Sequence, residues 1–131
     1  NKVRNYGWPI SSYGNHYDVV PINNYTKRYA PLYKIHSSYG FEEPIKYFEE
    51  SIGISQIMKK YQEKNVYFVT SLKDNSIYEI EFDQNFSFRR IINRLNIKER
   101  IRDIIYDKDN KCYFLYGETT PKLIYTCDNN K

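Results

Sequence analysis

The chain has 131 residues, which suits one domain, and its 40% hydrophobic and 27% charged residues exclude an intrinsically disordered protein. No apolar run of about 18 residues is present, so we expect no membrane span. The formal net charge of +4 is spread along the chain without a block of like charges, so we expect no nucleic-acid partner, and the 18% aromatic content (15 Tyr and 7 Phe) favours β structure.

The N-terminal part of the chain, residues 1–60, predicts a loop-rich segment. Residues 1–40 are rich in Gly, Pro, Asn, Ser and Tyr, a composition typical of long ordered loops. Only residues 52–61, which include Gly53, are ambiguous for a short helix. The chain begins at Asn1 without a charged region followed by an apolar region, so no signal peptide is visible in it.

Residues 61–131 contain an internal repeat with an offset of 46 residues. Residues 66–69 (VYFV) align with residues 112–115 (CYFL), and the match continues through the next strand of each unit without a gap. Each unit reads as strand, turn, strand, with polar residues in the turn. The predicted strands cover residues 66–69, 76–80, 86–92, 100–106, 112–115 and 122–126.

Short strands that recur every 40–50 residues are typical of β-propeller blades, although two similar hairpins in a β-sandwich would give the same pattern. A propeller closes with about four to eight blades, which at this repeat length needs about 184 residues or more. The chain is too short for that. We therefore predict an all-β fold in which residues 1–131 form a single portion of a longer propeller, with about two blades plus long loops.

Arg100 and Arg102 are the most informative charged pair. Residues two apart in a strand point to the same side, so the two guanidinium groups would stand together while Ile101 points into the packing. Arginine offers paired donors that suit a carboxylate or a phosphate, so an anion could lie between them. The residues alone leave open the alternative that Glu99 and Asp103 neutralise the pair locally.

The other candidate residues do not predict a complete active site. His16 and His36 lie in the loop-rich segment and are interpreted as loop hydrogen-bonding residues, since no His/Cys/Asp cluster has metal-ligand spacing. Neither a G-x-S-x-G elbow nor a Gly-rich phosphate loop occurs. Trp8 lies in a tight turn, as either a stacking platform or a plug. Cys112 and Cys127 would face each other across a hairpin, either as a disulfide or as two reduced thiols.

Four motifs resemble one known family. They are N-Y-G-W-P at residues 5–9, followed by Tyr13-Gly14 and Tyr17-Asp18, G-F-E-E-P-I at residues 40–45, S-I-G-I-S at residues 51–55 and E-R-I-R-D-I at residues 99–104. Their order and spacing are similar to those of the glucose/sorbosone dehydrogenases, the soluble aldose dehydrogenases that depend on pyrroloquinoline quinone (PQQ). The sequence departs from the family pattern at Lys98, where a glycine is expected, and in a shorter stretch over residues 56–64.

The resemblance implies the C-terminal part of a six-bladed β-propeller oxidoreductase, periplasmic or secreted, that oxidises the C1 hydroxyl of an aldose to the lactone and passes electrons to an external acceptor. By resemblance, Arg100 and Arg102 hold PQQ carboxylates, Trp8 lies beside cofactor and sugar, and Lys46 contacts the quinone in some members. The catalytic histidine and most Ca²⁺ ligands belong to earlier blades. We therefore expect no catalytic or metal-ligating residue in this chain, which would be inactive alone. The alternative is a non-catalytic propeller that binds a glycan or a protein.

Overall fold

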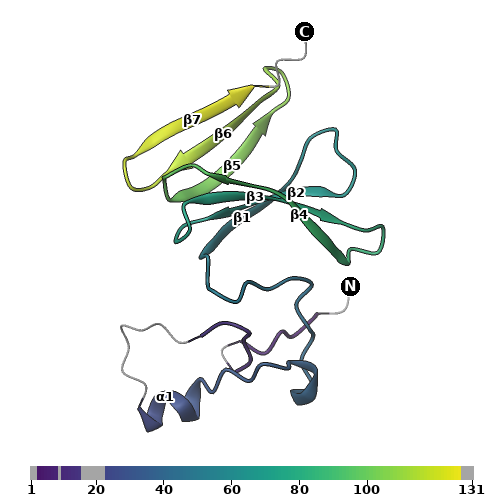
Figure 1. Ribbon diagram of the computed structural model, residues 1–131, viewed down its shortest axis with the longest axis vertical. Helices are drawn as coiled ribbons and strands as arrows, with labels where there is room; N and C mark the ends of the chain where they lie inside the picture. The colour runs from purple at the N-terminus through teal and green to yellow at the C-terminus, as the bar shows by residue number, and fades with distance from the viewer. Residues whose placement is uncertain (1–2, 9, 16–22, 128–131) are drawn as a thin grey trace. The chain divides into compact units, whose positions relative to one another are not determined.

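A computed structural model describes residues 3–8, 10–15 and 23–127. The chain divides into two compact units, Asn1–Ser51 and Ile52–Lys131, and each unit is described here by itself. Figure 1 gives the labels of the helix and strands used below.

The described residues of the first unit form loops and two short helical segments, α1 (Asn24–Tyr29) and the 3-10 turn η1 (Ser37–Tyr39). The side chain of Asn23 caps α1 by accepting a hydrogen bond from the Thr26 backbone N–H at 2.8 Å. The helix ends before Pro31, because a residue that precedes proline is disfavoured in the helical conformation. With six residues and no buried side chain, α1 has no apolar face that a sequence pattern could have revealed. No helix in the described part of the chain could cross a membrane.

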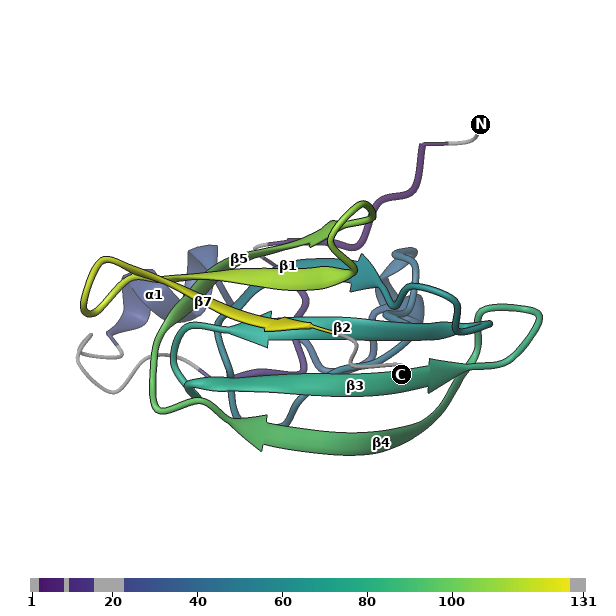
Figure 2. The ribbon, with the colours of Figure 1, turned by 90° about the horizontal axis from the view of Figure 1, so that it is seen from above.

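The second unit contains two antiparallel sheets, which confirms the all-β prediction (Figure 2). A four-stranded sheet has the order β1-β2-β3-β4, and a three-stranded sheet has the order β5-β6-β7. All six strands expected from the sequence are present, and each extends by one to four residues beyond the expected end. The strands are β1 (Ile54–Lys59), β2 (Val66–Ser71), β3 (Ser76–Phe82), β4 (Phe88–Asn96), β5 (Ile101–Asp107), β6 (Cys112–Gly117) and β7 (Lys122–Cys127).

Strand β1 occupies the stretch that the sequence left ambiguous for a helix, and it lies within the segment expected to be loop-rich. Pairing with β2 decides its conformation, since Ile57 pairs with Val69 and Met58 with Phe68. The strand also extends the internal repeat, because β1 pairs with β2 in the first sheet in the same way that β5 pairs with β6 in the second. The hydroxyl of Ser55 donates to the carbonyl of Ile101, 46 residues later in the chain, at 2.5 Å.

The hydrophobic core of this unit lies between the two sheets. Ile101 and Ile104 of β5 are 0% and 2% exposed, and they pack with buried residues of β3 and β6. Burial of one such side chain contributes about 1.5–3 kcal/mol to the free energy of folding. The core cluster comprises Ile77, Ile101, Ile104, Tyr113 and Leu115. The strand that carries Arg102 is therefore anchored on its inner face.

Cys112 and Cys127 form a disulfide, which settles the two alternatives left open by the sequence. They are direct partners in the register of β6 and β7, so the bond joins the last described residue of β7 to the first residue of β6. The sequence separation of the two cysteines is 15 residues. Closing a loop of this length restricts the unfolded chain and so favours the folded state.

We expect the Cys127→Ser substitution to lower the free energy of unfolding by about 3 kcal/mol, because it removes this restriction. Urea unfolding of the oxidised chain measures the effect. Dithiothreitol should produce a similar loss in the wild-type chain and none in the variant. A wild-type chain whose stability does not respond to the reductant would contradict the prediction.

Candidate functional site

Of the two arginines of the E-R-I-R-D motif, Arg100 directly precedes β5 and Arg102 is the second residue of this strand. Ile101 is fully buried between them, so strand alternation directs the Arg100 and Arg102 side chains outward, where they are 45% and 51% exposed. The register between β5 and β6 shifts around Arg102, since Ile101 pairs with Gly117 and Asp103 with Tyr116. This irregularity leaves Arg102 without a partner residue in the β5–β6 register.

Both guanidinium groups converge on one carboxylate, that of Glu118. Arg102 Nη2 lies 2.6 Å from Glu118 Oε1, and Arg100 Nε lies 3.5 Å from Oε2. The hydrogen bond from Arg102 is the main cause that lowers the pKa of Glu118, and the charge of Arg100 adds to it. The arginines thus stand together on one side of the strand and share a carboxylate.

Neither carboxylate that the sequence suggested as a local partner contacts the arginines. Glu99 turns inward and is 3% exposed. Asp103 accepts hydrogen bonds from the Gln56 side chain at 3.1 Å and from the Ile104 backbone N–H at 2.8 Å. The local partner is Glu118, which follows β6. Only the pairing of β5 with β6, which sets Gly117 opposite Ile101, brings Glu118 beside the pair.

Glu99 holds the loop that carries Glu118. Its carboxylate accepts hydrogen bonds from Thr119 N at 2.9 Å and from Thr120 N and Oγ1 at 3.3 and 2.9 Å, and it pairs with Lys122 Nζ at 2.9 Å. The hydrogen bond from Lys122 is the largest cause that lowers the pKa of Glu99 to about 2, and the two threonines add to it. These contacts fix the β6–β7 loop next to the arginines.

Gly117 allows the close approach of Glu99 to this loop. A Cβ atom at Gly117 would lie 2.7 Å from Glu99 Cγ, which is too close for two carbon atoms. The backbone N–H of Glu118 also donates to the Arg100 carbonyl at 2.8 Å. The glutamate of the motif therefore has a structural task, whereas the two arginines are exposed.

Trp8 lies in the first unit, on a turn that the N-Y-G-W motif builds. Gly7 adopts φ +76°, a conformation that favours glycine, and its N–H donates to the Asn5 side chain at 2.9 Å. A Cβ atom at Gly7 would also collide with the ring of Phe41. Trp8 is 86% exposed, so it does not plug this unit, and Pro9 lies outside the described residues.

Lys46 also belongs to the first unit. Its ammonium group lies 5.6 Å from the ring centroid of Tyr47 and 5.3 Å from that of Phe48, within range of cation–π attraction. The structure therefore places Trp8 and Lys46 in one unit and the arginine pair in the other.

His36 is a buried loop residue, as the sequence predicted. Its Nδ1 donates to the Tyr6 carbonyl at 2.9 Å, and its ring stacks on Tyr13 at a centroid distance of 5.2 Å. His16, Tyr17 and Asp18 lie outside the described residues. Within residues 3–8, 10–15 and 23–127, no group of three or more His, Cys, Asp or Glu side chains could hold a metal ion.

Comparison with known proteins gives one family match and two similar solved structures. The model of the family Glucose / Sorbosone dehydrogenase matches residues 1–125. A crystal structure of a glucose dehydrogenase is 21% identical with a TM-score of 0.71, over 97% of this chain and 36% of that chain. The soluble aldose sugar dehydrogenase of Escherichia coli, in its apo-form, is 22% identical with a TM-score of 0.69, over 95% and 35%. The chain spans about a third of these structures' length and shares their fold. No curated protein matches it.

The Glu99 contacts predict a pH dependence of stability. The folded-state pKa of about 2 lies below the ordinary value of 4.5, so the folded chain favours the ionised form. Its contribution to stability is therefore complete above about pH 4.5 and is lost as the pH falls towards 2. We expect the Glu99→Gln variant to melt several degrees below the wild type at pH 6, and the gap to close over this range. Melting temperature measured against pH tests this.

The control is Asp109→Asn, in the exposed turn between β5 and β6. The Asp109 side chain makes no hydrogen bond or ion pair with another described residue, so this variant should melt like the wild type at every pH. A constant gap between Glu99→Gln and the wild type from pH 6 to pH 2 would contradict the assigned role of the ionised carboxylate.

Proposed function

The chain belongs to the glucose/sorbosone dehydrogenase family, and on that premise we propose that it is the C-terminal part of a PQQ-dependent sugar dehydrogenase. The whole enzyme would oxidise the C1 hydroxyl of an aldose to the lactone and pass the electrons to an external acceptor. This chain would contribute Arg100 and Arg102 as ligands of the cofactor carboxylates. The observation that carries the proposal is the family match over residues 1–125, which include the E-R-I-R-D motif, and the convergence of both guanidinium groups on a single carboxylate supports it.

The donor set fits a ligand with several carboxylates. PQQ is a flat quinone with three carboxylate groups. The Glu118 carboxylate lies where a carboxylate of PQQ would bind the two arginines. The three side chains are 35–51% exposed, so an external anion can reach them. Two arginines on one glutamate also occur at Glu81, with Arg89 and Arg90 at 2.8 and 2.6 Å. The arrangement alone therefore does not identify a ligand site, and family membership distinguishes the pair on β5.

Each candidate site residue of this chain then has a defined task. Arg100 and Arg102 neutralise and orient carboxylates, Trp8 offers an exposed aromatic surface beside the cofactor and sugar, and Lys46 offers a positive charge near the quinone. Bound PQQ supplies the two-electron acceptor for the sugar oxidation. His36 donates Nδ1–H to a carbonyl and lies in a loop, so we assign it no catalytic task. We place the proton acceptor and most Ca²⁺ ligands outside this chain.

The two sheets are proposed to be neighbouring blades of a six-bladed propeller. Strands β1 and β5 each begin their sheet, run in the same direction and lie next to each other, as the innermost strands of adjacent blades do. The disulfide is consistent with a periplasmic or secreted location, because oxidising compartments preserve such bonds.

We expect the double substitution Arg100→Gln/Arg102→Gln in the full-length protein to weaken PQQ binding on the order of 100-fold, because two charge-assisted contacts are lost. Titration calorimetry with PQQ and Ca²⁺ measures affinity, and reduction of a dye by an aldose measures activity. The matched control is Arg89→Gln/Arg90→Gln, which removes the same charges from the pair on Glu81. Equal affinity in the two double variants would refute the assignment, and a wild type that binds no PQQ would favour the non-catalytic propeller.

Glu118 competes with an external carboxylate for the same two arginines. We therefore expect Glu118→Gln to tighten PQQ binding by roughly two- to fivefold, the range of an exposed ion pair. The same calorimetric titration measures this, with Glu50→Gln as a control that removes another exposed glutamate charge. Weaker binding in the Glu118→Gln variant would mean that Glu118 serves the site by holding the arginines in place.

A further inference from the structure

A second site lies in the second unit, at the far end of β5 from the arginine pair. It is a pocket of about 690 Å³ formed by the turn between β1 and β2 together with residues at the end of β5. This volume falls within the range of small-molecule sites. We call it the lysine pocket, because its lining includes Lys59, Lys60, Lys64 and Lys108.

The lysine pocket is separate from the proposed cofactor site. Strand β5 begins at Ile101, beside the arginines, and ends at Asp107, next to Lys108. At about 3.3 Å per residue, the two ends of this strand lie about 20 Å apart. One small ligand cannot occupy both sites, so a ligand in the pocket would be distinct from one at the arginines.

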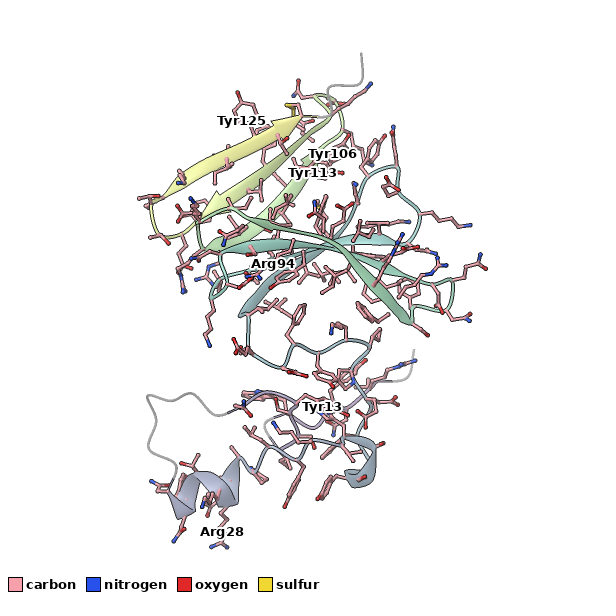
Figure 3. The ribbon with its side chains drawn as sticks, viewed as in Figure 1. Tyr13, Arg28, Arg94, Tyr106, Tyr113 and Tyr125 are labelled. Carbon is pink, nitrogen blue, oxygen red and sulfur yellow. A yellow bond between two sulfur atoms is a disulfide. The ribbon has the colours of Figure 1, made fainter. Side chains whose placement is uncertain are left out.

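Tyrosine rings form a fixed wall of the pocket. Tyr61 stacks on Tyr106 at a centroid distance of 4.4 Å and an interplanar angle of 23°, and Tyr106 contacts Tyr113 at 4.5 Å. Figure 3 shows Tyr106 and Tyr113 next to each other on β5 and β6. The backbone N–H of Tyr61 donates to the Tyr113 hydroxyl at 3.0 Å, and the rings pack against the hydrophobic core. These contacts hold the Tyr61 and Tyr106 rings in place at the pocket.

The charge of the pocket is strongly positive. Four lysines and one carboxylate, Glu63, line it. Lys60 is committed to the protein, because it pairs with Glu79 at 2.6 Å, and the hydrogen bond that Lys60 donates to Glu79 raises the pKa of Lys60. Lys59, Lys64 and Lys108 form no ion pair with any described residue. The carboxylate of Asp107, the residue before Lys108, accepts hydrogen bonds from the backbone N–H and the side chain of Asn110 in the same turn.

From the tyrosine wall and the uncommitted ammonium groups, we propose that the lysine pocket binds a small aromatic anion. The ring of the ligand stacks against Tyr61, and its anionic head group takes charge-assisted hydrogen bonds from Lys64 and Lys108. A ligand of this class complements both the apolar wall and the positive rim. This site does not depend on the proposed PQQ chemistry, so the two proposals can fail separately.

The test is titration calorimetry of the full-length protein with phenyl phosphate, at low salt. We expect phenyl phosphate to bind more tightly than inorganic phosphate, which lacks the ring, and than phenol, which lacks the charge. The double substitution Lys64→Gln/Lys108→Gln should weaken phenyl phosphate binding at least about tenfold. The matched control, Lys73→Gln/Lys98→Gln, removes two exposed lysine charges that do not line the pocket and should leave the affinity unchanged.

Two further measurements keep the test decisive. Tyr61→Leu should reduce the affinity for phenyl phosphate to that for inorganic phosphate, because the stacking surface is lost. In the wild-type chain, affinity should fall as NaCl rises, which needs no variant to fold. Absence of phenyl phosphate binding, equal binding of inorganic phosphate, or equal losses in the two double-lysine variants would overturn the proposal.

Discussion

The contact between β1 and β5 is the constraint on which both sites depend. Ser55 donates to the Ile101 carbonyl at 2.5 Å and Gln56 to Asp103 at 3.1 Å, so the first strands of the two sheets are held side by side in the same direction. Their starting ends carry the arginine pair, and their final ends carry the lysine pocket. Because Ile101 is fully buried at this junction, the strand cannot rotate without exposing the core.

A single motif can serve structure and binding at once, and E-R-I-R-D shows how the tasks are divided. Glu99 is buried and holds the β6–β7 loop through two threonines and Lys122. Ile101 fills the core, whereas Arg100, Arg102 and Asp103 are exposed. A buried carboxylate is stable here because each of its oxygens has partners, and loss of those partners would leave a buried charge unpaired. The motif is therefore informative for fold as well as for ligand.

The sequence predicted that Arg100 and Arg102 stand on one side because strand alternation is a local rule, and the burial of Ile101 between them agrees with it. It did not predict the register shift that follows Ile101, which leaves Asp103 exposed as well. It missed Glu118, whose position depends on the register between β5 and β6 and on the small size of Gly117. It also missed the lysine pocket, because Lys64 and Lys108 are far apart in the chain and come together only when Tyr61 stacks on Tyr106. Sites built across two sheets leave no short motif.

The sequence by itself determined six of the seven strands and the spacing between the repeated strands, because apolar strand residues and turn residues act over a few positions. It also determined the family, because the N-Y-G-W-P and E-R-I-R-D motifs are short continuous segments. Tertiary structure decided the rest. Residues 54–59 became β1 because β2 offered a partner, and Cys112 and Cys127 became bonded because the β6–β7 register paired them. The tertiary structure also buries Glu99 and leaves Glu118 partly exposed. Glu99 can be buried because the packing surrounds its carboxylate with hydrogen-bond donors from the β6–β7 loop.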